Sequence, residues 1–87
     1  MNDLTFTTQG FQEYVYWQTQ DRKTLKKINS LLEDIKRNGA LIGTGKPEKL
    51  KNRPEYSRRI DDCNRLVYDI DELGNIRIIS CRGHYED

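Results

Sequence analysis

The feature that most constrains the fold of this sequence is a run of apolar residues spaced three and four apart. The run consists of Leu25, Ile28, Leu31, Leu32 and Ile35. This spacing places all five on one face of an amphipathic α-helix, which must pack that face against another element. Asp21 is a suitable N-cap, and Gly39 can take the left-handed conformation that often follows a helix. The sequence therefore predicts a long helix between Asp21 and Gly39.

A shorter helix is predicted just before it. Phe11, Tyr14, Val15 and Gln18 fall at helical spacing, so we expect a helix over residues 10–19, capped by Thr7 or Thr8. The break between the two helices is short, which favours a helical hairpin. Residues 4–6 alternate apolar and polar side chains and predict an edge strand ahead of the hairpin.

Beyond Gly39 the pattern changes from helix to strand. Glycines and prolines predict a loop through Leu50 that continues to Pro54. Strands are expected over residues 56–60, 66–68 and 76–81, and the short turns between them favour an antiparallel meander. We therefore predict one α+β domain spanning residues 1–87. In it, a strand precedes a two-helix hairpin, which packs on one face of an antiparallel sheet in the order β-α-α-β-β-β. The expected core combines Leu25, Ile28, Leu32, Ile35, Leu66, Tyr68, Ile76 and Ile78.

Several function classes are disfavoured by the composition. No stretch is long and apolar enough to cross a membrane, and no signal peptide is visible, so we expect a cytoplasmic protein. Cys63 and Cys81 lack a CxxC spacing, which predicts two reduced thiols. The chain has one histidine, so a zinc enzyme lacks ligands; no metal or other cofactor is expected.

Basic residues are concentrated in one part of a nearly neutral chain. The net charge is +1, yet residues 46–59 carry six basic residues and two acidic ones. The six are Lys46, Lys49, Lys51, Arg53, Arg58 and Arg59. Such a stretch suits either a phosphate-binding surface or a solvated loop, and charge alone does not separate the two. Arg58 and Arg59 are adjacent in a strand, so they should point to opposite faces.

Three other side chains suit RNA cleavage without a metal. That reaction needs a base for the ribose 2′-OH, a cation for the phosphate and an acid for the leaving oxygen. Glu48 is a carboxylate in the glycine-bearing loop, Arg65 opens a strand, and His84 follows the last strand. In a meander, the start of one strand and the end of its neighbour share an edge, so Arg65 and His84 can meet. From the residues alone, solvated surface roles for Glu48 and His84 remain the stronger interpretation.

A family resemblance changes this balance. The segments Gly43–Glu48 (GTGKPE), Tyr56–Ile60 (YSRRI), Asn64–Tyr68 (NRLVY) and Cys81–Tyr85 (CRGHY) resemble YoeB/Txe toxins of the RelE/ParE superfamily, which belong to type II toxin–antitoxin systems. The resemblance implies an endoribonuclease that cleaves messenger RNA in the ribosomal A site. It further implies that Glu48 is the general base, Arg65 stabilises the phosphate charge, His84 is the general acid and Tyr85 helps to position the RNA. Lys46, Lys49, Lys51, Arg58 and Arg59 would then bind RNA phosphates.

The resemblance also implies partners. We expect the 70S ribosome with its messenger RNA, a YefM-like antitoxin, operator DNA only through the antitoxin complex, and a possible homodimer. Two alternatives stay open. One is the gyrase-poisoning branch of the superfamily, and the other is a non-catalytic module that acts by binding an antitoxin and operator DNA. The joint presence of Glu48, Arg65 and His84 argues against the first.

Overall fold

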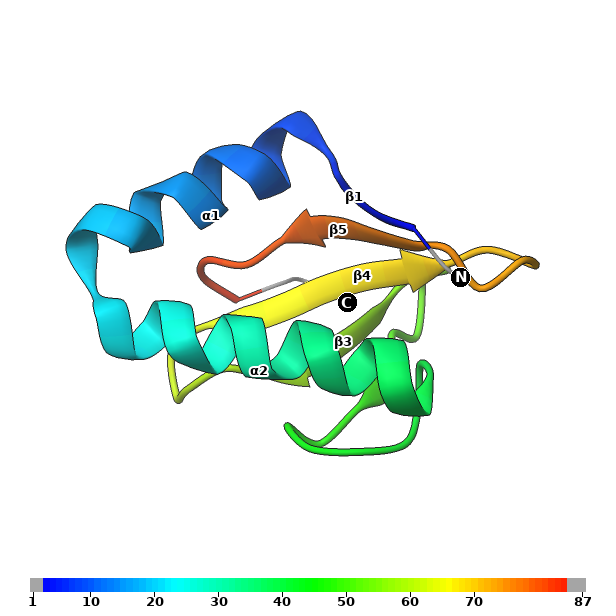
Figure 1. Cartoon of the computed structure of the whole chain (residues 1–87). Helices are drawn as coiled ribbons and strands as arrows, with labels where there is room; N and C mark the ends of the chain where they lie inside the picture. The colour runs from blue at the N-terminus through cyan, green and yellow to red at the C-terminus, as the bar shows by residue number, and fades with distance from the viewer. Residues whose placement is uncertain (1–2, 85–87) are drawn as a thin grey trace.

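The computed structural model describes residues 3–84, which form two helices and five strands. The strands form one sheet in the order β1-β5-β4-β3-β2, and both helices cover the same face of it (Figure 1). In chain order the elements are β1 (Leu4–Phe6), α1 (Thr8–Gln20), α2 (Arg22–Asn38), β2 (Glu48–Lys49), β3 (Tyr56–Arg59), β4 (Arg65–Ile70) and β5 (Ile76–Ser80). This matches the predicted order of strand, helical hairpin and meander, with one added short strand.

Helix α2 begins and ends where its local sequence predicts. The Asp21 carboxylate accepts hydrogen bonds from the backbone N–H groups of Lys23 and Thr24, which the first turn otherwise leaves unpaired. At the other end Gly39 has φ of 89°, and its N–H donates to the Ile35 carbonyl. Helix α1 is capped by Thr7, so it starts two residues earlier than the apolar spacing suggested.

The sheet is mixed rather than purely antiparallel. Strands β2 to β5 pair antiparallel, as expected of a meander, whereas β1 pairs parallel with β5. The helical hairpin carries the chain back across the sheet, so β1 enters beside β5 in the same direction. The Ile76 N–H donates to the Asp3 carbonyl, and the Thr7 N–H donates to the Ile78 carbonyl. The three-residue pattern of β1 does not indicate that its neighbour in the sheet is β5.

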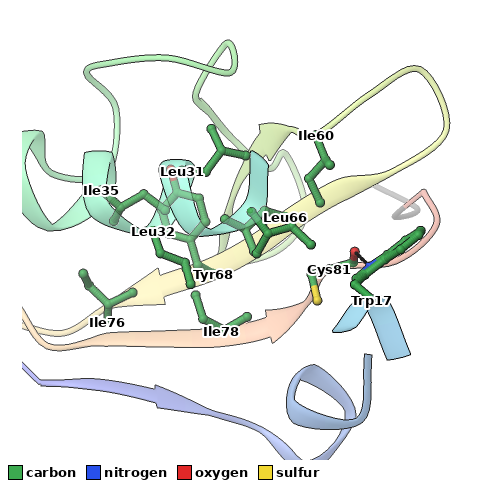
Figure 2. Close-up of a cluster of buried hydrophobic side chains, with 11 residues drawn as sticks. Trp17, Leu31, Leu32, Ile35, Ile60, Leu66, Tyr68, Ile76, Ile78 and Cys81 are labelled. Carbon is green, nitrogen blue, oxygen red and sulfur yellow. Dashed lines mark hydrogen bonds between the residues drawn. The ribbon is translucent and has the colours of Figure 1, made fainter. Parts of the chain in front are cut away.

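The core lies between α2 and the sheet (Figure 2). Apolar residues of α2 meet those that β4 and β5 direct to the same side, as strand alternation requires. The buried cluster is Trp17, Ile28, Leu31, Leu32, Ile35, Ile60, Leu66, Tyr68, Ile76, Ile78 and Cys81. Leu25 is only partly buried and packs at its margin, so the prediction that it is a core residue is correct only in part. The opposite face of the sheet is left uncovered by helices.

Candidate active site

A small cavity of about 130 Å³ lies where β2, β3 and β4 meet, and Lys46, Glu48, Ser57, Arg59 and Arg65 line it. Strand pairing brings these residues together: Glu48 lies opposite Ser57, and Arg59 lies opposite Arg65. The Ser57 hydroxyl donates to Glu48 Oε1 at 3.4 Å. Four of the predicted site residues thus converge on one place, and three of them are cations around a single carboxylate.

Glu48 belongs to a strand and not to the loop expected from the sequence. Strand β2 has only two residues, Glu48 and Lys49, and pairs with the start of β3. Its shortness explains why glycine and proline signals on either side masked it. The pairing gives the carboxylate a defined place beside Ser57.

Arg65 is held by the turn that precedes its strand. Its guanidinium Nη1 donates to the carbonyls of Asp61 at 2.7 Å and Asn64 at 3.1 Å, and its backbone N–H donates to the Gly83 carbonyl at 3.0 Å. The last bond places the segment around His84 beside the first residue of β4. The expected meeting of this strand start with the end of the following strand is therefore observed in the backbone.

The His84 ring contacts the same turn that holds Arg65. Its Nε2 is 3.1 Å from the Asp62 carbonyl oxygen, which can only accept, so a hydrogen bond there requires a proton on Nε2. The neighbouring Gly83 N–H donates to Asn64 Oδ1 at 2.7 Å. The ring itself is exposed. Tyr85, the fourth predicted catalytic residue, lies outside the described residues 3–84.

Helix α1 anchors the segment that leads to His84, which sequence reasoning missed. The Cys81 N–H donates to Glu13 Oε1 at 2.7 Å, and Trp17 Nε1 donates to the Cys81 carbonyl at 2.9 Å (Figure 2). The Arg82 guanidinium stacks over the Tyr16 ring at 3.8 Å from its centroid. These contacts join residues more than sixty positions apart, so no local pattern signals them.

Arg58 does not belong to the RNA-binding set. It is fully buried, and its guanidinium is paired with Asp34 of α2 on the helix-covered side of the sheet. The remaining donors bond to the Tyr68 hydroxyl and to the carbonyls of Gly39, Ile42 and Thr44. The prediction that Arg58 contacts phosphate is therefore wrong, because no donor faces solvent. Successive side chains of a strand point to opposite faces, so Arg59 points to the face of the sheet that the helices do not cover.

Of the other predicted phosphate ligands, the three lysines are exposed and Arg59 is partly exposed. Lys46 and Lys51 lie at the surface, and Lys46 has a positive φ of 51°. Lys49 donates to the carbonyls of Leu50 and Arg53. Arg59 forms a surface ion pair with Asp62 at 2.7 Å, which solvent screens and a competing anion can displace.

A larger cavity, of about 450 Å³, lies near the other end of β4 and β5. Its single basic side chain, Arg77, is already paired with Asp69 at 2.8 Å, and Asp71 adds a further negative charge. This cavity is therefore unsuited to an anion. Within residues 3–84 no three His, Cys, Asp or Glu side chains cluster closely enough to hold a metal ion. Neither helix in that range is long and apolar enough to span a membrane.

Known proteins match this chain over most of its length. Residues 6–85 match the family model described as a YoeB-like toxin of bacterial type II toxin–antitoxin systems. Toxin YoeB of Streptomyces coelicolor is 45% identical over 84 residues, which cover 94% of this chain and 98% of that one. In a YoeB–YefM heterotetramer from Staphylococcus aureus, one chain is 52% identical with a TM-score of 0.88, covering 98% of this chain and 99% of that one. A YoeB dimer from S. aureus is also 52% identical, with a TM-score of 0.89 and coverage of 97% and 98%.

Proposed function

Because the chain belongs to the YoeB-like toxin family of bacterial type II toxin–antitoxin systems, we propose that it is an endoribonuclease that cleaves messenger RNA in the ribosomal A site. One observation carries the proposal. A single carboxylate, Glu48, shares a small cavity with the guanidinium groups of Arg59 and Arg65. A cavity with one proton acceptor and several cations suits a reaction in which a hydroxyl attacks a phosphate.

In the proposed reaction Glu48 removes the proton from a ribose 2′-OH, and the resulting oxygen attacks the adjacent phosphorus. Arg65 neutralises the charge that grows on the phosphate oxygens, with Arg59 beside it. The bond from phosphorus to the 5′-oxygen breaks, and His84 gives that oxygen a proton. The products are a 2′,3′-cyclic phosphate, which water can open to a 3′-phosphate, and a 5′-hydroxyl end. No oxidant, reductant or cofactor enters the balance.

The remaining residues have supporting roles in this proposal. Lys46, Lys49 and Lys51 extend the positive charge of the cavity along the surface and bind RNA phosphates outside the scissile one. Tyr85 helps to position the RNA by stacking or by hydrogen bonding. Arg58 has no direct part, since its side chain is fully buried.

The same proposal assigns partners. The S. aureus relatives form a YoeB–YefM complex and a YoeB dimer, which supports a YefM-like antitoxin and a homodimer for this chain. We expect operator DNA to be bound only through the antitoxin complex, and the toxin to act in the cytoplasm, where ribosomes are. The antitoxin should cover the edge around Arg65 and His84, because doing so blocks the reaction.

Primer extension on programmed ribosomes tests this function. Messenger RNA bound to ribosomes should be cut at A-site codons when the protein is added, whereas the same messenger without ribosomes should remain intact. The new ends should be a cyclic or 3′-phosphate and a 5′-hydroxyl. Intact messenger on ribosomes, together with inhibition of gyrase supercoiling, would assign the chain to the gyrase-poisoning branch. Absence of both activities would leave only antitoxin and operator binding.

A further inference from the structure

The segment of residues 39–46, here called the glycine loop, connects α2 to β2 and so delivers Lys46 and Glu48 to the cavity. Its backbone has a positive φ at four positions. Gly39, Gly43 and Gly45 have φ of 89°, 129° and 82°, and Lys46, which is not a glycine, has φ of 51°. Glycine adopts a positive φ readily, whereas Lys46 adopts it only where surrounding contacts impose it. One buried side chain donates to three carbonyls of this loop.

That side chain is Arg58, and the glycine loop is wrapped around it. Its Nη2 donates to the carbonyls of Gly39 at 2.8 Å and Ile42 at 2.9 Å, and its Nη1 donates to the carbonyl of Thr44 at 3.0 Å. The planar guanidinium thus binds three carbonyl groups along the loop backbone at once. A lysine has no such fork and cannot do the same.

Asp34 of α2 completes the arrangement. Its Oδ2 accepts from Arg58 and also from the Thr44 N–H at 3.0 Å. The loop lies so close to this carboxylate that a Cβ on Gly43 would overlap Asp34 Oδ2, and one on Gly45 would lie 2.8 Å from Leu31 Cδ2. The loop therefore packs closely against the side chains of Asp34 and Leu31.

The fixed loop is connected directly to the cavity. The Arg59 N–H donates to the Gly45 carbonyl at 2.6 Å, one residue before Lys46. Strand β3 then has two separate tasks. On one face Arg58 holds the loop, and on the other Ser57 and Arg59 line the cavity with Glu48.

From this we propose that Arg58 and Asp34 are positioning residues for Glu48. They hold the glycine loop in the one conformation that presents Glu48 to the ribose 2′-OH. The inference rests on the proposed function, because it assigns Glu48 the role of base. A positioning role differs measurably from that of a purely stabilising ion pair. Loss of the pair should reduce the contribution of Glu48 to the cleavage rate while the rest of the fold stays in place.

The test uses mild substitutions, because removing Arg58 outright would leave the core unable to fold. Asp34→Asn keeps the shape and the acceptor oxygen but removes the charge, and Gly43→Ala pushes the loop away from Asp34. Glu33→Gln, on the exposed side of the same helix, is the control for the first. Gly74→Ala, at another positive-φ glycine in the β4–β5 turn, is the control for the second.

Single-turnover cleavage on saturating ribosomes should fall roughly 100-fold in both variants, as expected for a misplaced catalytic group, and stay near wild type in both controls. Combined with Glu48→Gln, Asp34→Asn should add little further loss, because the base is already absent. Unchanged rates, or an equal loss in the Glu48→Gln background, would overturn the positioning role.

A second measurement does not depend on RNA cleavage. Thermolysin, which cuts on the N-terminal side of leucine and isoleucine, should cut the folded Asp34→Asn and Gly43→Ala variants at the exposed Leu41 and Ile42 of the glycine loop faster than it cuts wild type and the controls. Equal thermolysin rates would show that the pair does not hold the loop, and so would overturn the inference even if the wild type cleaves RNA. Faster cutting of the variants, in a protein whose wild type has no nuclease activity, would overturn the proposed function. Arg58 and Asp34 would then hold the glycine loop, but Glu48 would not be a base.

Discussion

Arg59 lies directly opposite Arg65 in the antiparallel pairing of β3 and β4, and both side chains line the cavity that contains Glu48. Like charges in this relationship repel and destabilise a sheet. In the free protein each guanidinium finds its own acceptor: Arg59 pairs with Asp62, and Arg65 donates to the carbonyls of Asp61 and Asn64. A phosphate in the cavity would place a negative charge between these two cations, so we expect the pair to bind an anion.

The first prediction concerns this pair. Arg59→Gln should weaken binding of a short single-stranded RNA and lower the slope of log affinity against log salt by about 0.7, the value for one lost phosphate contact. Thermal stability should stay equal or rise slightly, since a repulsive neighbour has gone. Arg77→Gln is the matched control, because Arg77 is ion-paired with Asp69 away from the cavity. An unchanged salt slope in Arg59→Gln would place this side chain outside the RNA path.

The second prediction concerns the packing of α1 on β5. Alanine is favoured over glycine within helices by about 1 kcal/mol, yet Gly10→Ala should destabilise the protein by about 1–3 kcal/mol. A Cβ at Gly10 would lie 2.5 Å from the Ile78 carbonyl oxygen, which is backbone and cannot rotate away. Urea denaturation measures the change, with the exposed Gln12→Ala as a control on the same helix. A stabilised Gly10→Ala variant would show that α1 does not approach β5 this closely.

The third prediction concerns acid stability. The hydrogen bond from Arg58, followed by that from the Thr44 N–H, holds the pKa of Asp34 below its ordinary value of 3.8. A depressed pKa in the folded state gives stability that is present above pH 3.8 and is lost as the pH falls through and below that value. The stability advantage of wild type over Asp34→Asn should therefore shrink from pH 6 to pH 3 in urea titrations. A difference that does not change with pH would mean that Asp34 is not titrating against this partner.

The fourth prediction separates the two cysteines, both of which are free thiols in the structure. Burial raises the pKa of Cys81 to about 12, so it is almost entirely protonated at neutral pH and unreactive, whereas Cys63 is exposed. Native protein should react quickly with one equivalent of a thiol reagent, and Cys63→Ser should abolish that phase. Denaturant should release the second thiol. Two fast equivalents in native wild type would show that the region around Cys81 opens readily.

The sequence was most informative where the rules are local. Helix α2, its Asp21 cap and its end at Gly39 were all predicted, because each depends on residues that are close together in the sequence. The parallel pairing of β1 with β5 was not predicted, since the sequence of a three-residue strand does not indicate which strand it pairs with. Sheet order is decided by how the whole helical hairpin packs.

The same distinction applies to the site. Alternation established that Arg58 and Arg59 face opposite ways, but not which of them faces the core. That choice depends on Asp34, which lies 24 positions earlier in the chain. The anchoring of Cys81 by Glu13 and Trp17 was missed for the same reason. Glu48 and Arg65 were identified from motifs, and the structure adds that they share one cavity.

The central claim is that Glu48 acts as the base, and one comparison tests it most directly. Glu48→Gln keeps the size of the side chain and its contact with Ser57 but cannot take a proton. Glu55→Gln makes the same chemical change at a carboxylate that instead pairs with Arg53 at 2.8 Å. The measurement is the single-turnover rate of messenger cleavage on saturating ribosomes, with free Mg²⁺ held constant and ribosome binding determined in parallel.

Glu48→Gln should lower this rate by about 10²–10⁴ with ribosome affinity unchanged, the usual cost of losing a general base. Glu55→Gln should cleave near the wild-type rate. A Glu48→Gln variant that cleaves like wild type, or one that loses activity only because it no longer binds ribosomes, would contradict the assignment of Glu48 as the base.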